Sequence, residues 1–233
     1  PWSQSSSIPG TRPKLLRTTP PRIHSDDDSL NGRAHGRVTR VPTRRYNVPR
    51  MALSQITWHD VQQMPDDGNR YEAIAGELHV TPAPSVRHQW ISGELEAALR
   101  GLLAGGRLGL MFHAPVGVEF PSTGEGVQPD IVVIAAARRG IIDEDWIRGA
   151  PDIVIEILSP GTQRRDRGVK LKLYERQGVE EYWIVDPASR AVEVWRFHGG
   201  AVCERCTGIL PVRLAGETLG EIDLAAVFSA ASP

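Results

Sequence analysis

Two short segments of nearly identical sequence carry carboxylates into what should be the core of the molecule. They are Pro129-Asp-Ile-Val-Val-Ile134 and Pro151-Asp-Ile-Val-Ile-Glu-Ile157. Runs of Ile and Val bounded by Pro, Gly and Ser are typical of strands that are covered on both faces. An ionised carboxylate in such a strand costs several kcal/mol unless a cation or hydrogen bonds compensate. A bound metal ion is one such compensation.

The alternation of side chains along the second strand places an acid among apolar neighbours. With a period of two, Glu156 shares a face with Asp152, Val154 and Leu158. Asp130 begins the first strand, where a neighbouring strand would bring it beside Glu156. Two carboxylates that converge from adjacent strands form a hard oxygen site, which suits Mg²⁺ or Mn²⁺ better than zinc. Such a site supports phosphoester hydrolysis, because the ion polarises the phosphate and lowers the pKa of a bound water.

The elements that must position these residues follow a mixed order. The sequence predicts a short helix after an N-cap at Thr57, a hairpin over 70–80 that turns at Ala75-Gly76, and a helix over 86–103. Strands over 108–112 and 116–120 and a glycine-rich turn over 122–126 lead to the two opening strands. A helix over about 164–177 and strands over 181–185 and 191–197 follow them. Residues 135–150 are interpreted as a surface loop or partial helix. The C-terminal third has a weaker strand pattern and a short helix near 224–228. This order indicates an α/β or α+β fold with a central mixed sheet flanked by helices.

Charge and composition divide the chain near residue 50. Residues 1–50 hold ten Arg or Lys residues against three Asp residues, whereas the remainder is acidic. Because they lack apolar periodicity, we predict that residues 1–50 form a disordered basic extension and that residues 51–233 form the folded domain. The extension is either a basic arm for nucleic acid or sequence upstream of a true start at Met51. The second interpretation is favoured, because Met51 directly precedes the first patterned segment.

Other features narrow the class of protein. No stretch approaches the roughly 18 apolar residues of a membrane span, and no signal segment opens the chain, so we expect a soluble, cytoplasmic protein. Cys203 and Cys206 form a single CxxC motif, which supplies at most half of a tetrahedral zinc site. We interpret them as incidental thiols.

Seven motifs, in order along the chain, resemble those of the Uma-type restriction endonucleases, a family of the PD-(D/E)XK nuclease superfamily. They are Arg70-Tyr-Glu72 with Gly76-Glu77-Leu78, Pro82-Ala-Pro-Ser85, Arg87-His88-Gln89, Gln128-Pro-Asp130, Pro151-Asp-Ile-Val-Ile-Glu-Ile-Leu-Ser-Pro160, Asp166-Arg-Gly-Val-Lys170 and Gly178-Val-Glu-Glu-Tyr-Trp-Ile-Val-Asp-Pro187. The resemblance runs from about Ile56 to Phe197. It implies the restriction-endonuclease-like fold and metal-dependent cleavage of DNA. It also implies that Asp130 is the first metal-binding acid and Glu156 the second.

One position departs from the superfamily pattern. The superfamily's Lys normally follows the second acid by two residues, and here that position is Leu158. We predict that Lys170 replaces it, because Lys170 lies in a family-like motif on the following helix and would reach back over the strand end. The alternative is an ion pair between Lys170 and Asp166 on an exposed helix face. Lys172 lies about 200° round the helix and is the weaker candidate.

Two more acids are possible ligands. Glu77 is the expected supplementary metal ligand, because its Gly-Glu-Leu context resembles that of the family; the alternative is a solvated strand charge. Asp152 shares a face with Glu156, but an acid at a strand entrance more often caps the strand end.

A set of basic residues is predicted to bind DNA. Arg164, Arg165 and Arg167 follow Glu156 at a helix start, where cations oppose the helix dipole, so phosphate binding is favoured over a solvated basic turn. Arg87 and His88 are further candidates at the start of the long helix. His88 would touch phosphate, act as a base or serve a structural role.

Together these features predict a Mg²⁺- or Mn²⁺-dependent endonuclease that hydrolyses DNA, with Asp130, Glu156 and Lys170 as catalytic residues. Cutting both strands of a duplex favours a homodimer. The alternatives are an inactive nuclease-fold module for nucleic-acid binding or dimerisation, and a phosphodiesterase acting on RNA. The distance between the Lys170 nitrogen and the two carboxylates discriminates between an active and an inactive centre.

Overall fold

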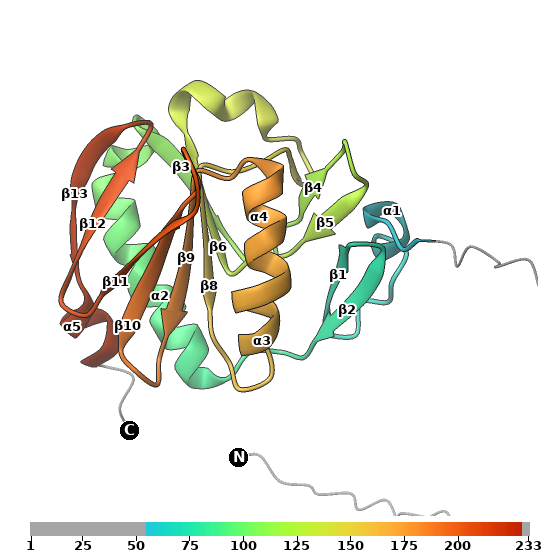
Figure 1. Ribbon diagram of the computed structural model, residues 1–233, viewed down its shortest axis with the longest axis horizontal. Coiled ribbons are helices and arrows are strands. Elements are labelled where there is room, and N and C mark those ends of the chain that lie inside the picture. The colour runs from blue at the N-terminus through green and yellow to red at the C-terminus, as the bar shows by residue number, and fades with distance from the viewer. Residues whose placement is uncertain (1–54, 230–233) are drawn as a thin grey trace, which may run out of the picture. The chain divides into compact units, whose positions relative to one another are not determined.

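The structure is a computed structural model that describes residues 55–229, so the predicted extension over residues 1–50 lies outside the described residues. Its largest sheet has six strands in the order β11-β10-β9-β8-β6-β3 (Figure 1). The strands are β3 (Gly109–His113), β6 (Ile131–Ala135), β8 (Ile153–Ile157), β9 (Glu181–Asp186), β10 (Ala191–Arg196) and β11 (Val202–Cys206). β8 and β9 are parallel, and the other pairs in this sheet are antiparallel.

One face of this sheet is covered by the long helix α2 (Val86–Leu102) and by the C-terminal elements. The apolar stripe of α2, including Ile91, Leu95 and Leu99, packs on the face that carries Ile153 and Ile155. The C-terminal elements are the hairpin of β12 (Ile209–Leu214) and β13 (Glu217–Asp223), followed by α5 (Leu224–Ser229). The amphipathic spacing read from the sequence is therefore confirmed for α2.

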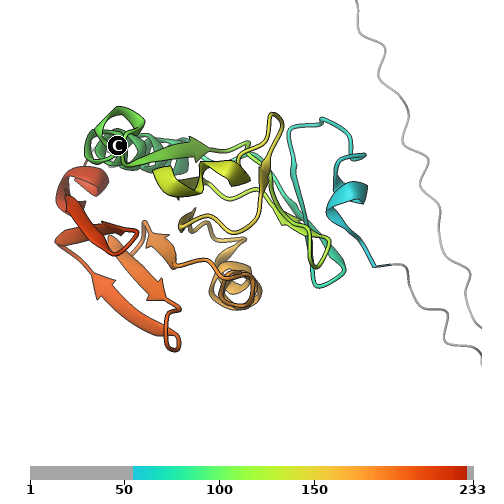
Figure 2. The same ribbon diagram turned by 90° about the horizontal axis from the view of Figure 1, so that it is seen from above.

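The opposite face is covered by the helical segment that connects β8 to β9. This segment consists of α3 (Gln163–Arg165), the π-helical turn η3 (Asp166–Lys170) and α4 (Leu171–Gln177), and it ends at Gly178 with φ 81°. Leu173 and Tyr174 pack against Val154 on this face. Figure 2 shows this segment and α2 on opposite sides of the strands. The predicted mixed sheet between helices is confirmed.

A second sheet lies beside the helical segment and has the order β2-β1-β5-β4-β7 (Figure 1). Its strands are β1 (Arg70–Ile74), β2 (Glu77–Thr81), β4 (Val118–Phe120), β5 (Glu125–Val127) and β7 (Ile147–Arg148). The hairpin of β1 and β2 turns at Ala75 and Gly76, both with positive φ, as the sequence predicts. The short helix α1 (Trp58–Val61) begins at the predicted N-cap Thr57 with a capping box.

The sequence did not predict two of the short strands: β5 falls within the segment interpreted as a turn, and β7 falls within 135–150. The 3₁₀ helix η2 (Ala136–Ile141) agrees with the partial helix expected within 135–150. A second 3₁₀ turn, η1 (Ala104–Gly106), follows α2. Strands of two or three residues have too few positions to show a period, and long-range pairing with β1 and β4 defines them.

Two negative findings concern the described residues. None of their helices is long and apolar enough to cross a membrane. Cys203 is exposed, Cys206 is buried, and both are free thiols.

Candidate active site

The structure brings Asp130 and Glu156 together at one end of the six-stranded sheet. β6 and β8 are antiparallel with Ile131 opposite Ile155, so the next step in the register sets Asp130 beside Glu156. The backbone N–H of Ile157 donates to Oδ2 of Asp130 at 2.8 Å. Each of the two acids is 3% exposed. The pairing of β6 with β8 therefore holds two acidic side chains next to each other in the protein interior.

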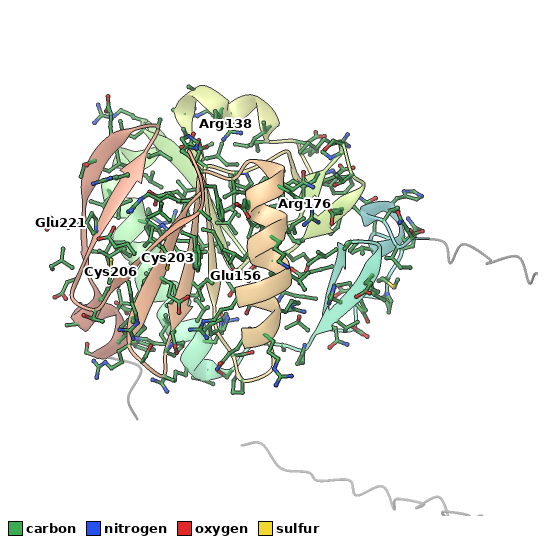
Figure 3. The ribbon with its side chains drawn as sticks, viewed as in Figure 1. Arg138, Glu156, Arg176, Cys203, Cys206 and Glu221 are labelled. Atoms are coloured by element: carbon green, nitrogen blue, oxygen red, sulfur yellow. The ribbon has the colours of Figure 1, made fainter. Side chains whose placement is uncertain are left out.

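The amino group of Lys170 lies within this buried group. Its Nζ is 2.6 Å from Oε1 of Glu156 and 2.8 Å from Oε1 of Glu72, and the residue is 1% exposed (Figure 3 labels Glu156 beside the helical segment). Lys170 is the last residue of the π-helical turn, a local widening that often accompanies functional sites. An exposed ion pair between Lys170 and Asp166 is therefore not formed. Lys172 is exposed.

Glu72 is the acid that the sequence analysis missed. It is buried on β1, and its Oε1 accepts from the backbone N–H of Gln128 at 3.0 Å as well as from Lys170. Glu77, the acid that was expected, is exposed at the start of β2, and among the described residues no ion pair or hydrogen bond joins it to Lys170. The signal for Glu72 was the alternation along β1, which puts its side chain on the face of the buried Ile74.

Two basic side chains hold the carboxylate of Asp130. Arg70 Nη1 is 2.6 Å from Oδ1, and His88 Nε2 is 3.0 Å from Oδ2. The N-cap Ser85, whose Oγ accepts from the backbone N–H of His88, fixes the first turn of α2 and with it the position of His88. Burial opposes the charge of Asp130, but the hydrogen bond from His88 and the charge of Arg70 lower its pKa to about 2. Asp130 is therefore ionised at neutral pH.

The surroundings of Glu156 favour its neutral form, in contrast to those of Asp130. Burial raises the pKa of Glu156 to about 8, against the effect of Lys170 and with that of the nearby Asp130. Its Oε1 accepts from Lys170 and from the hydroxyl of Tyr174 at 2.8 Å, while no donor in the described part of the chain contacts Oε2. Oε2 is thus the oxygen that can carry a proton. The pKa of Lys170 is raised despite burial, because Glu156 and Glu72 favour its charge.

The site has more carboxylates than cations. We use the name acidic cluster for the buried residues Glu72, Asp130, Glu156 and Asp166. Three cationic side chains accompany them: Arg70, Arg165 and Lys170. In addition, Glu72 Oε2 and Asp166 Oδ1 are buried without a hydrogen-bond partner. Because burial keeps Glu156 protonated at neutral pH, the three remaining carboxylates are matched in number by the three cations.

The donor set of the acidic cluster fits a hard divalent cation. Mg²⁺ is commonly held by one or two carboxylates and keeps several of its waters. Asp130 and Glu156 supply such a pair once Glu156 has released its proton, and the ion would balance the negative charge that this release adds. Among residues 55–229 no group of three or more His, Cys, Asp or Glu side chains is arranged to hold a metal ion.

The predicted DNA-binding arginines have different surroundings. Arg165 donates to Thr81 Oγ1 at 2.7 Å and lies 3.7 Å from Glu72, so it faces the acidic cluster. Arg167 is paired with Glu193 at 2.8 Å and with Asp186 at 3.2 Å. Two arginines are exposed: Arg164, and Arg87, which donates to the carbonyl of Pro187.

A cavity of about 590 Å³ adjoins the acidic cluster. Asp130, Arg70 and His88 form one side of it, and Trp58, Tyr71 and Trp146 are among the residues on its other sides. This volume is in the range of small-molecule sites. Of the acidic cluster, only Asp130 is among the lining residues.

The chain was compared with known proteins. The model of the family described as "Uma2: Putative restriction endonuclease" matches residues 58–224. A solved structure, described as that of a putative nuclease belonging to DUF820 from Anabaena variabilis ATCC 29413, is similar in fold with a TM-score of 0.63 and 22% sequence identity. The similarity covers 76% of this chain and 99% of that one. No curated protein matches the chain.

Proposed function

The chain belongs to the Uma2 family, and from this premise we propose that it is a metal-dependent endonuclease that hydrolyses phosphodiester bonds of DNA. The observation that carries the proposal is the contact of Lys170 Nζ with Glu156 at 2.6 Å, within a buried cluster that also holds Asp130. A lysine beside two carboxylates is what phosphoester hydrolysis needs, although this lysine comes from a helix rather than from the strand.

Asp130 and Glu156 would hold Mg²⁺ or Mn²⁺. Such an ion, when bound, polarises the phosphate and lowers the pKa of a bound water. Glu156 must release its proton before it can act as a ligand. Arg70 must leave Oδ1 of Asp130, where it is now hydrogen-bonded at 2.6 Å. Glu77 was the third predicted ligand; its exposed position favours a solvated strand charge instead.

The remaining residues of the site position the catalytic side chains or stabilise the charge that develops on the phosphate. Lys170 stays charged at neutral pH and would stabilise the negative charge that develops on the phosphate. Glu72 orients Lys170 from its second side at 2.8 Å, and Tyr174 fixes Oε1 of Glu156. His88 holds Oδ2 of Asp130, which keeps the other oxygen directed toward Arg70.

Contacts to the DNA backbone fall to exposed cations near the site. Arg164 and Arg87 are exposed, and we assign them to phosphate contacts. Arg165 would act through Glu72, and Arg167 is held by Glu193 and Asp186. Cleavage of both strands by an enzyme with one centre per chain favours two copies, so a cytoplasmic homodimer completes the proposal.

Nicking of supercoiled plasmid tests the proposal. The wild type is compared with Asp130→Ala and Glu156→Ala in Mg²⁺, in Mn²⁺ and in EDTA. We expect nicking by the wild type with either ion and none in EDTA or by the variants. Equal nicking by all three proteins would contradict the assignment.

A second function is favoured by one observation. The ion pair of Arg70 with Asp130 occupies an oxygen that a metal would need, as in a nuclease fold that binds nucleic acid without cutting it. Absence of nicking by the wild type, together with retained DNA binding in a gel-shift assay, would favour this binding module.

A further inference from the structure

The cavity beside Asp130 has walls that suit a flat, apolar ligand. Three of its lining side chains are aromatic, namely Trp58, Tyr71 and Trp146, and Met64 and Pro115 also line it. Flat side chains of this kind form stacking surfaces for nucleobases. The cavity therefore offers aromatic surface next to the acid that would hold the metal.

The position of Trp58 is fixed by two close glycines. A Cβ at Gly126 would come within 2.3 Å of the Trp58 ring, and one at Gly117 within 2.5 Å, so the ring lies directly against the backbone of β5 and of the segment before β4. The indole N–H groups of Trp58 and Trp146 are buried and have no acceptor among the described residues. Because these two nitrogens are closed off from solvent, a ligand in the cavity would meet the rings and not their N–H groups.

The charges around the cavity exclude a phosphate. Asp66, Glu96 and Asp145 line it together with Asp130, whereas Arg70, the one Lys or Arg among its lining residues, is engaged by Asp130. Like charges would repel a phosphate group from this interior. A neutral group with hydrogen-bonding edges is compatible with it, and a nucleobase is such a group.

We propose that this cavity binds an unpaired nucleobase, with the adjoining phosphate outside it beside the metal ion that Asp130 would hold, and that the substrate class is DNA with an unstacked or unpaired nucleotide. This inference rests on the proposed nuclease function and deepens it. A base that is already unpaired enters such a pocket at less cost than one in a duplex, because little stacking and pairing energy is lost. The cavity of about 590 Å³ lies within the range of small-molecule pockets.

Binding of the nucleoside deoxyadenosine, which has no phosphate for the acids of the cavity to repel, tests the pocket apart from cleavage. It is measured by calorimetry on the full chain in EDTA, for the wild type, Trp146→Ala and Trp146→Phe. Trp90→Ala is the matched control, because Trp90 is 47% exposed on α2 and does not line the cavity. We expect binding by the wild type and by Trp90→Ala, a loss of roughly tenfold or more in Trp146→Ala, and partial retention in Trp146→Phe.

Cleavage of two matched duplexes, one fully paired and one with a single bulged adenine, supplies the second measurement. We expect the wild type and Trp90→Ala to cut the bulged duplex about tenfold faster in Mn²⁺, and Trp146→Ala to lose this preference. Equal cleavage of both duplexes without deoxyadenosine binding would overturn the pocket and leave the nuclease function intact. Deoxyadenosine binding without cleavage of any DNA would support the pocket and overturn the nuclease function.

Discussion

The two Pro-Asp segments have the same local sequence and opposite surroundings. Asp130 precedes β6, and Asp152 precedes β8; because the two strands are antiparallel, the two acids lie at opposite ends of the pair. Asp130 meets Glu156, His88 and Arg70 at the cavity. Asp152 accepts from the backbone N–H of Ala135 at 2.8 Å and is paired with Arg138, which Figure 3 labels at the far end of the sheet. Strand direction, and not the motif, decides which acid enters the site.

The largest expected effect is on the rate of DNA cleavage, which should depend on Asp130 and not on Asp152. Asp130→Asn should lower the rate of DNA cleavage at least about a hundredfold, because loss of an outer partner of a metal site already costs about 10-fold to 100-fold. Asp152→Asn should keep the rate within about twofold, with some loss of stability. Plasmid nicking and thermal unfolding of both variants check this. Similar losses of activity in both would break the comparison.

Lys170 lies at the Asp130 end of the strand pair, and its replacement should lower the stability of the protein. Lys170→Met should lower the free energy of unfolding by about 3–5 kcal/mol, because it leaves Glu72 and Glu156 buried without their shared cation. Lys172→Met, on an exposed position of the same helix, should change it by less than about 0.5 kcal/mol. Urea unfolding measures both. An equal, small effect would mean that the buried ion cluster is not formed.

The pKa of Glu156 predicts an unusual pH dependence. The folded protein holds a proton up to about pH 8 that the unfolded chain releases near its ordinary value of 4.5. The Glu156 contribution to the free energy of unfolding is therefore greatest below pH 4.5 and falls as the pH rises to about 8. Glu156→Gln should flatten the fall between pH 5 and 8. Denaturant unfolding in EDTA across this range measures it, and parallel curves for the two proteins would contradict the assignment.

The arginines Arg70 and Arg138, one at each end of the strand pair, should differ in their effect on metal affinity, and this effect is smaller. Arg70→Met should raise the affinity for Mn²⁺ several-fold, because Arg70 competes with a cation for Oδ1 of Asp130. Arg138→Met removes the partner of Asp152 and should leave Mn²⁺ affinity unchanged. Calorimetric titration of both variants decides the matter. Weaker binding in Arg70→Met would show that Arg70 supports the site.

The smallest expected effect concerns the helix that follows β8. Arg164→Ala should reduce the slope of log DNA affinity against log salt by about one. Arg167→Ala should leave this slope unchanged and lower the free energy of unfolding by at most about 1 kcal/mol, since Arg167 is 35% exposed and its pairs with Glu193 and Asp186 lie near the surface. Gel-shift titrations over a series of salt concentrations measure the slopes. A reduced slope in Arg167→Ala alone would reverse the two roles.

Local pattern predicted most of the fold, because the central elements are long enough to show a period. α2, the β1–β2 hairpin and the buried strands β6 and β8 all lie close to their predicted positions. The burial of Glu156 also followed from alternation. β5 and β7 were not predicted, because pairing with distant strands, rather than their own two or three residues, makes them strands.

The candidate site was harder to predict, because the residues that form its ion pairs come from distant segments of the chain. Glu72 and Glu77 both stand in family-like positions, and only the fold shows that Glu72 meets Lys170, 98 positions further along the chain. Arg167 reads as a free cation until β9 and β10 bring Asp186 and Glu193 to it. The engagement of Asp130 by Arg70 likewise depends on the second sheet.

Titration of Mn²⁺ into the metal-free protein tests the central claim most directly. Wild type, Asp130→Asn and Asp152→Asn are compared by calorimetry at pH 8, where release of the proton from Glu156 opposes binding least. We expect equal affinity for the wild type and Asp152→Asn, and a loss of at least about tenfold for Asp130→Asn. Unchanged affinity in Asp130→Asn, or an equal loss in Asp152→Asn, would contradict that claim.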